Sequence, residues 1–376
     1  MKKLGVKIYT TDWHTWYGID YEDAADDLER LGVALAFVVN TGDEAPASGA
    51  APHRVADKYR KWANEYDDLR FRDALARRGI KYLTPIALFL NPERLKRERD
   101  LYPINAVGEP MAQNGWYIGL CPSSDAYLEE RLADAAATVK RLEPDGVFLM
   151  FIRFPGFWER WTPEYTRDLT DEYCFCRRCL AHFSSAAGIE LPSEVTLAAQ
   201  RILSLHRDAW TRWKCQLIAS IVRDVRSTVR EISPSTEIAI NTLPLREAEY
   251  GGAIHEIFGQ DAAEISPYAD MFEVMTYHQV TKREPDWVAS VANEVKARTG
   301  KPVFLTVLSR PRYLDGVYQI DGRAQAISAT EFQSCVRAVG QSGADGLVLR
   351  WEDMLQDQLE GRDDMYKDLM RELTGG

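Results

Sequence analysis

Short apolar runs recur along the chain and are separated by longer stretches with helical periodicity. In one of them, 147–152, the sequence VFLMFI has no polar alternation, as expected of a parallel strand covered on both faces. Arg153 follows only where this strand should end. Seven comparable runs complete a set of eight predicted strands: 6–11, 33–41, 81–90, 145–152, 233–244, 269–278, 301–309 and 344–351.

The stretches between these runs carry helix signals. Between Arg201 and Ile232, apolar residues recur every three or four positions, which predicts one long helix with a single buried face. Ser328 and Glu331 have the spacing of a capping box that opens the last long helix. Eight strands that alternate with helices predict an α/β fold, a (β/α)8 TIM barrel.

We expect one barrel domain over residues 1–376, with an extended loop after the fourth strand that carries a cysteine cluster at about 155–200. Two doubly wound domains are the weaker alternative, because no linker rich in proline, glycine or serine divides the chain. Asp145-Gly146 and Asp345-Gly346 open the fourth and eighth strands. We expect both pairs to set strand register at the barrel end opposite the catalytic face.

Composition limits the partners. The chain has 376 residues, of which 45% are hydrophobic, and a formal net charge of -11. This charge argues against nucleic acid and anionic membranes, because both require a basic surface. The sequence contains no apolar stretch long enough for a membrane span and no apolar signal-peptide centre at its start. We therefore expect a cytoplasmic protein, although a removed leader stays open, and a homo-oligomer is compatible with the sequence.

Aromatic and polar residues gather where the predicted strands end, which is the functional face of such a barrel. Sugar rings place apolar C–H faces on aromatic planes, and their hydroxyls pair with carboxylates, amides and arginine. The mixture favours a glycan cleft, although any single tryptophan can equally cap the barrel. The expected substrate-binding residues are Trp13, His14, Arg153, Trp158, Glu159, Asn241, Tyr277, His278, Arg350 and Trp351.

Several segments resemble known families. DGVFLMFIRFP at 145–155 resembles the fourth strand of glycoside-hydrolase-like barrels, in which Asp-Gly leads through an apolar strand to Asp-(aromatic)-Ile-Arg-(aromatic)-Pro. YADMFEVMTYH and the later PDWV resemble their sixth strand and the segment after it. The order of a CPS segment, the Asp-Gly strand, a Cys-x-Cys-x-x-Cys loop and a long Trp-bearing helix is similar to β-galactosidases with a four-cysteine zinc cluster. The similarity covers roughly 115–355.

The cysteines carry the sharpest local hypothesis. Cys174, Cys176 and Cys179 have the spacing of clustered thiolate ligands, and Cys121 occupies the place from which those β-galactosidases recruit a fourth. The resemblance implies a closed, structural zinc site. His182 could replace Cys121, and free buried cysteines are the alternative to a metal. The isolated cysteines at positions 215 and 335 lie in apolar helices and are expected to be buried free thiols.

Hydrolysis of a glycosidic bond requires two carboxyl groups. Alternation puts Phe148, Met150 and Ile152 on one face of the fourth strand, which we take as the barrel interior. Met150 stands where the similar families have aspartate. The seventh strand, VFLTVLS, offers no carboxylate nucleophile either, although the β-galactosidase resemblance demands one.

Any catalytic pair must therefore come from other strands. Glu352 shares the face of Arg350 at the end of strand eight, and Glu273 is expected deeper on strand six, where burial would raise its pKa toward that of a proton donor. We rank Glu352 and Glu273 first as catalytic residues and Asp12 next. Two functions stay open: an atypical glycoside hydrolase acting on an oligosaccharide or glycoside, and an inactive glycan-binding barrel, or pseudoenzyme.

Overall fold

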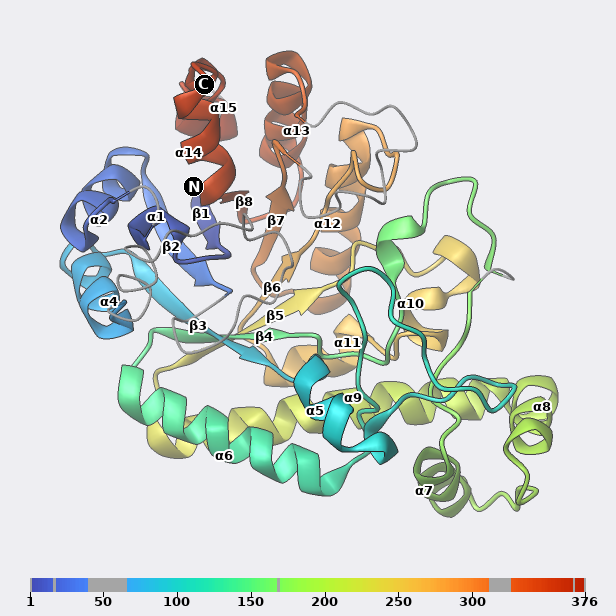
Figure 1. Cartoon of the computed structure of the whole chain (residues 1–376). Helices are drawn as coiled ribbons and strands as arrows, with labels where there is room; N and C mark the ends of the chain where they lie inside the picture. Colours follow the sequence, from blue (N-terminus) through green and yellow to red (C-terminus); the bar gives the residue numbers. More distant parts are fainter. Residues whose placement is uncertain are drawn as a thin grey trace.

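Eight parallel strands close into one barrel in the computed structural model, which describes residues 2–15, 18–39, 66–167, 170–310, 326–367 and 369–374. The strands follow chain order around the barrel, and β1 pairs with both β2 and β8 (Figure 1). Each overlaps one predicted strand, which confirms the TIM barrel. Their bounds are β1 Lys3–Ile8, β2 Val33–Val38, β3 Lys81–Ala87, β4 Gly146–Met150, β5 Glu237–Thr242, β6 Met271–Val274, β7 Val303–Val307 and β8 Gly346–Arg350.

The helices surround this barrel (Figure 1). In the described part of the chain, none of them is both long and apolar enough to cross a membrane. The α-helices are α1 Asp12–Thr15, α2 Tyr21–Arg30, α4 Asp68–Arg77, α5 Pro92–Arg97, α6 Asp125–Leu142, α7 Arg177–Ala187, α8 Val195–Leu205, α9 Arg207–Ile232, α10 Ala253–Glu256, α11 Ala262–Ile265, α12 Pro285–Thr299, α13 Ala329–Gln341, α14 Trp351–Leu359 and α15 Leu369–Thr374.

Aspartates fix the register where strands enter the barrel. Asp145 Oδ2 accepts the backbone N–H of Tyr82 at 2.9 Å, and Asp345 Oδ2 accepts that of Val303 at 2.9 Å. In each case the carboxylate that precedes one strand accepts a backbone N–H from the start of the neighbouring strand. Gly346 is required by space, since a Cβ there would lie 2.4 Å from the Lys3 carbonyl oxygen. The structural interpretation of both Asp-Gly pairs is therefore confirmed.

The barrel interior is filled by large apolar side chains that include Phe148 and Met150, as the alternation predicts. Ile152 was expected on the same face, but it packs with the outer core instead. The cause is Phe151, whose backbone has a left-handed φ of 55° directly after β4 and ends the alternation. Strand parity therefore stops being informative at Met150.

The long helix predicted from Arg201 is two helices in the structure. Helix α8 ends at Leu205, and His206, with φ -133° and ψ 20°, separates it from α9. The apolar spacing of α9 is as predicted, with Trp210 and Val225 buried. The capping box is also confirmed, because Ser328 Oγ accepts the Glu331 backbone N–H at 3.1 Å. The periodicity and the capping box thus predicted the helices correctly, but nothing in the sequence indicated the break at His206.

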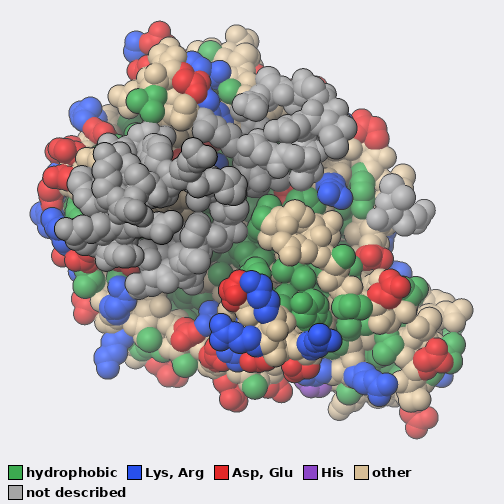
Figure 2. Space-filling model, viewed as in Figure 1, with side chains coloured by type: hydrophobic (Ala, Val, Ile, Leu, Met, Phe, Trp, Pro, Cys, Tyr) green, Lys and Arg blue, Asp and Glu red, His purple; other side chains and the backbone are tan. Residues whose placement is uncertain are grey.

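An excursion follows β4 and includes α7 and α8. Its Phe175 ring stacks on Trp210 of α9, with centroids 5.2 Å apart and planes at 14°. Lys214 of α9 is fully buried and pairs with Glu172 of the excursion at 2.8 Å. These contacts hold the excursion against the amino-terminal part of α9, where α7 and α8 lie at the lower right of the view (Figure 1). In the same view, apolar side chains gather at the centre of the face with charges of both signs around them (Figure 2).

Candidate active site at the barrel mouth

Glu352 is held at the barrel mouth by the end of β1. It lies in the first turn of α14, which begins directly after β8. Its Oε1 accepts the backbone N–H groups of Tyr9 at 2.5 Å and Thr10 at 2.8 Å, and its Oε2 lies 3.5 Å from Arg350 Nε. Burial raises the pKa of Glu352, while Arg350 and the backbone donors oppose that shift.

Asp12 shares the surroundings of Glu352. Thr10 connects the two, because its hydroxyl accepts the Asp12 backbone N–H at 3.2 Å while its own N–H binds Glu352. Burial raises the pKa of Asp12, against the effects of Thr10 and the nearby Arg350. Glu352 lies at the mouth as expected, but the alternation of side chains along β8 is not the reason. The strand ends at Arg350, and the first turn of α14 carries the Glu352 carboxyl group to the mouth. Arg350 therefore lies near enough to both acids to lower their pKa values.

Glu273 lies deeper, inside the barrel, and is fully buried. Its Oε2 is 2.9 Å from Lys7 Nζ and accepts a 2.6 Å hydrogen bond from Asn241 Nδ2, and the Thr306 hydroxyl donates to Oε1. That Glu273 donates a proton stays a prediction. In this structure Lys7, Asn241 and Thr306 contact its two oxygens.

Two tyrosine hydroxyls lie beside the buried ion pair. Tyr277 OH is 3.5 Å from Lys7 Nζ and 2.9 Å from Tyr9 OH. Trp158 of the excursion brings its ring to 5.8 Å from the Tyr277 ring. Neither Lys7 nor Tyr9 was predicted as a site residue. The lysine was detectable, because a charge within the apolar run VKI at an interior position requires a buried partner.

Arg153 and Glu159 organise the loop after β4. Arg153 is buried and donates to the Gly156 carbonyl oxygen at 2.7 Å and to Tyr117 OH at 3.2 Å. Its guanidinium therefore joins the loop after β4 to the connection between β3 and α6. Glu159 is also buried, and burial raises its pKa to about 7 although nearby Arg153 lowers it. Glu159 therefore lies in the same loop as Arg153, and its carboxyl group has a pKa well above the ordinary value.

The raised pKa of Glu159 predicts a pH-dependent stability. Below the ordinary value of 4.5 the carboxyl group is protonated in both states, whereas between 4.5 and about 7 the folded state keeps a proton that the unfolded state releases. Stability should therefore fall by about 3 kcal/mol as pH rises through this window. Glu159→Gln should lack this fall in urea unfolding across pH 4 to about 8. The exposed Glu129→Gln is the control, and an unchanged slope in Glu159→Gln would contradict the assignment.

Trp13 and Trp351 form part of an aromatic core. Their ring centroids are 5.2 Å apart, and Trp13 also lies 4.6 Å from Phe71. Both tryptophans are at most 1% exposed, so neither presents an open face to a sugar. His14, half-buried, stacks on Tyr21 at 4.5 Å. For these residues the barrel-capping interpretation agrees with the geometry better than the glycan-binding one.

His278 lies beyond β6, which ends at Val274, and contacts α13. Its Nε2 is 2.9 Å from Glu331 Oε1, and Cys335 Sγ is 3.6 Å from both ring nitrogens. Burial raises the pKa of Cys335 to about 12, so this thiol is not an activated nucleophile. Cys215 and Cys335 are both buried free thiols, as predicted.

Four cysteines gather between two loops. Cys121 comes from the connection between β3 and α6, Cys174 and Cys176 come from the excursion, and Cys179 lies in α7. All four are buried free thiols whose sulfurs lie within 4.8 Å of one another. His182 is not part of this group. The cluster therefore joins the β3 loop to the β4 excursion, as the sequence suggested.

The cluster has the dimensions of a tetrahedral thiolate site. Cys121 Sγ lies 3.6 Å from Cys176 Sγ and 3.4 Å from Cys179 Sγ. A tetrahedron with metal–sulfur bonds of about 2.3 Å has edges of roughly 3.8 Å, and these two separations lie close to that value. The backbone N–H of Ile104 points to Cys174 Sγ at 3.5 Å, which is a typical outer contact of a metal-bound thiolate.

The barrel superposes on solved glycoside hydrolases. With the glycoside hydrolase domain of PgaB (BpsB) from Bordetella bronchiseptica it shares a TM-score of 0.68 and 13% identity, over 98% of this chain and 99% of that chain. The chain has the barrel fold of glycoside hydrolases. The β-galactosidase from Bacillus circulans sp. alkalophilus gives 0.64 and 11% identity, over 98% of this chain and 56% of that chain. The β-amylase catalytic domain from Paenibacillus polymyxa gives 0.57 and 11%, over 94% and 93%.

These likenesses establish the fold, and the site must be argued from this barrel's own residues. The chain spans 56% of the Bacillus β-galactosidase, so it corresponds to little more than half of that protein. No protein-family model matches the sequence, and no curated protein matches it either. Catalytic roles therefore rest on the geometry at the barrel mouth.

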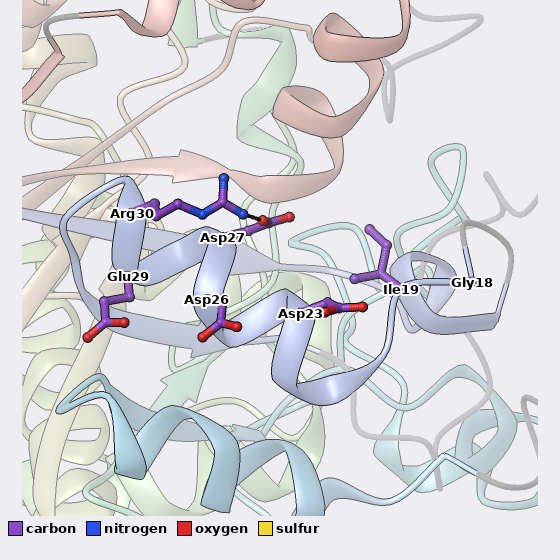
Figure 3. Close-up of a pocket in the computed structure, with 7 residues that line it drawn as sticks. All are labelled: Gly18, Ile19, Asp23, Asp26, Asp27, Glu29 and Arg30. Atoms are coloured by element: carbon purple, nitrogen blue, oxygen red, sulfur yellow. Dashed lines mark hydrogen bonds and ion pairs between the residues drawn. The ribbon is translucent and has the colours of Figure 1, made fainter.

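A hollow lies along α2, and neither Asp12 nor Glu352 lines it (Figure 3). It is lined by acidic side chains of one helix face, including Asp23, Asp26 and Glu29. Asp26 pairs at 2.5 Å with Arg78, directly after α4, and Asp27 pairs with Arg30. These are solvated surface ion pairs, which contribute little to stability and mark no ligand.

Proposed function

We propose that this barrel hydrolyses O-glycosidic bonds, with Asp12 and Glu352 as its two catalytic carboxyl groups. The supporting observation is that both acids lie just beyond the carboxyl ends of β1 and β8, that Arg350 acts on the pKa of both, and that burial raises the pKa of both. A TIM barrel places its chemistry at this face. The shared fold of solved glycoside hydrolases adds to the proposal.

The two acids differ in a way that suits their roles. Glu352 Oε1 is fixed by two backbone N–H groups, and Oε2 lies toward Arg350, so Glu352 is suited to act as the nucleophile or to activate water. Asp12, with a pKa raised by burial, is suited to protonate the leaving oxygen. Lys7, paired with Glu273, lies 3.5 Å from the Tyr277 hydroxyl and orients it.

Substitution of either acid tests the hydrolysis. Glu352→Gln and Asp12→Asn should each lower kcat/KM on a panel of nitrophenyl glycosides and neutral oligosaccharides by about 1000-fold, because each removes a group that acts in the transition state. Glu129→Gln, an exposed acid on α6, is the matched control and should retain full turnover. Unchanged turnover in both Glu352→Gln and Asp12→Asn would remove the proposal.

A second candidate is a barrel that binds glycans without cleaving them. Met150 supports it, because its side chain packs with Phe148 in the barrel interior and leaves β4 without an acid. Glycan binding by the wild type without any turnover would favour this second function. Hydrolysis gained by Met150→Asp would further identify lost chemistry on β4.

We also propose that Cys121, Cys174, Cys176 and Cys179 hold one structural zinc ion. The sulfur separations and the outer backbone donor support this set of ligands. Four protein ligands leave no open position, so the ion would stabilise the excursion and take no part in hydrolysis.

A further inference from the structure

The barrel mouth is chemically divided. Asp12 and Glu352 lie on the β1 and β8 side, whereas β4 ends at Met150 and is followed by Phe151. The strands follow chain order, so β4 and β8 face each other across the barrel. With strands about 4.8 Å apart and tilted by about 36°, opposite strands of an eight-stranded barrel are roughly 15 Å apart. That distance exceeds the width of one sugar ring.

The β4 side carries an aromatic group, the β4 platform, made of Trp116, Tyr117, Phe151 and Phe157. Trp116 and Phe151 are half-buried, with ring centroids 6.1 Å apart and planes at 68°. Tyr117 is buried and stacks with Phe151 at 6.3 Å and 25°. The Arg153 guanidinium also packs on the Tyr117 ring, 5.1 Å from its centroid. The half-exposed rings are therefore backed by a rigid, buried layer.

The backbone of Phe151 sets this residue apart. Its φ of 55° lies in the left-handed region, which bulky residues rarely adopt and which glycine adopts without strain. Phe151 packs against both the barrel interior and the outer core, so it lies at the rim between them. Strained, non-glycine residues cluster at functional sites, where the side chain is needed in that position. A half-exposed ring held at a strand's carboxyl end fits that description.

We propose that the β4 platform is a subsite that stacks one ring of an uncharged oligosaccharide, while another unit of the same chain lies at Asp12 and Glu352. The proposal extends the hydrolysis proposed above, and it rests on that function only for the sugar unit at Asp12 and Glu352. Apolar ring faces on Phe151 and Trp116 suit the C–H faces of a sugar. A net charge of -11 disfavours polyanionic glycans. The substrate class we propose is therefore a glycan chain without negative charge, and its simplest member is a neutral oligosaccharide.

Binding measured without hydrolysis tests the subsite. Neutral mono- to tetrasaccharides of glucose, galactose, xylose, mannose and N-acetylglucosamine would be titrated calorimetrically into the Glu352→Gln variant. Adding Phe151→Gly or Trp116→Ala should weaken the best tetrasaccharide about tenfold and leave its monosaccharide within about twofold. Glu143→Gly is the matched control, because Glu143 also has a positive φ of 43° but is exposed at the end of α6. It should change neither affinity.

The outcomes separate the two proposals. Tetrasaccharide binding that survives both platform substitutions, or an equal loss of monosaccharide and tetrasaccharide affinity, overturns the subsite. Failure of the whole panel to bind overturns it as well. Platform-dependent binding by a wild-type protein that cleaves no member of the panel supports the subsite while overturning hydrolysis. Circular dichroism of each variant shows that lost binding is not lost folding.

Discussion

Lys7→Met should destabilise the protein by roughly 3–5 kcal/mol, because it leaves the Glu273 carboxylate buried inside the barrel without its cation. Glu273 is 0% exposed and Lys7 2%, with 2.9 Å between Oε2 and Nζ. Hydrogen bonds from Asn241 and Thr306 cannot replace a charge partner. Equilibrium urea unfolding measures the loss as a change in midpoint at constant slope.

A double-mutant cycle isolates the ion pair. Glu273→Leu alone should also be strongly destabilising, since it leaves the Lys7 ammonium buried, whereas Lys7→Met with Glu273→Leu removes both charges at once. The double variant should be more stable than either single variant, because replacing a buried pair with apolar side chains is often nearly neutral. The exposed pair of Lys367 with Asp364 is the control, and its cycle should give less than about 1 kcal/mol. Additive losses in the Lys7 cycle would contradict the buried pair.

The sequence predicted the barrel well, because the fold is determined by repeated, redundant patterns. Every strand is an apolar run, and the closed sheet needs only their number and alternation with helices. Asp145 and Asp345 were predicted to set register at strand starts, and both accept a backbone N–H of the neighbouring strand. Local φ changes at Phe151 and His206 left no such pattern and were missed.

The candidate site was predicted less well, because burial and pairing depend on the whole barrel. Trp13 and Trp351 follow strands, as a sugar platform would, but each packs against the other in the core. Glu352 reached the mouth through a helix turn that strand parity cannot describe. Glu273 was placed correctly inside the barrel, yet its role depended on Lys7, which lies far away in sequence and opposite it in the barrel interior. Trp116 and Phe151 carried no recognisable pattern.

Loss of zinc should release the β4 excursion while leaving the barrel strands in place. Protein purified without chelator should contain one zinc per chain by elemental analysis, and Cys174→Ser or Cys179→Ser should contain none. Zinc that binds only the folded state stabilises by about 4 kcal/mol at a free concentration a thousandfold above its Kd. Both variants should therefore have a lower unfolding midpoint and faster proteolysis at 155–200.

The barrel should survive this loss because the cluster joins two loops and no strand. Cys121 lies after β3, and the other three ligands lie beyond β4, so strand pairing does not depend on them. Far-UV circular dichroism of Cys174→Ser should remain close to that of the wild type. Cys215→Ser is the matched control, since Cys215 is a buried thiol outside the cluster, and it should keep its zinc. Wild-type protein without zinc, whose four clustered thiols react freely in the folded state, would show that the cysteines are merely buried together.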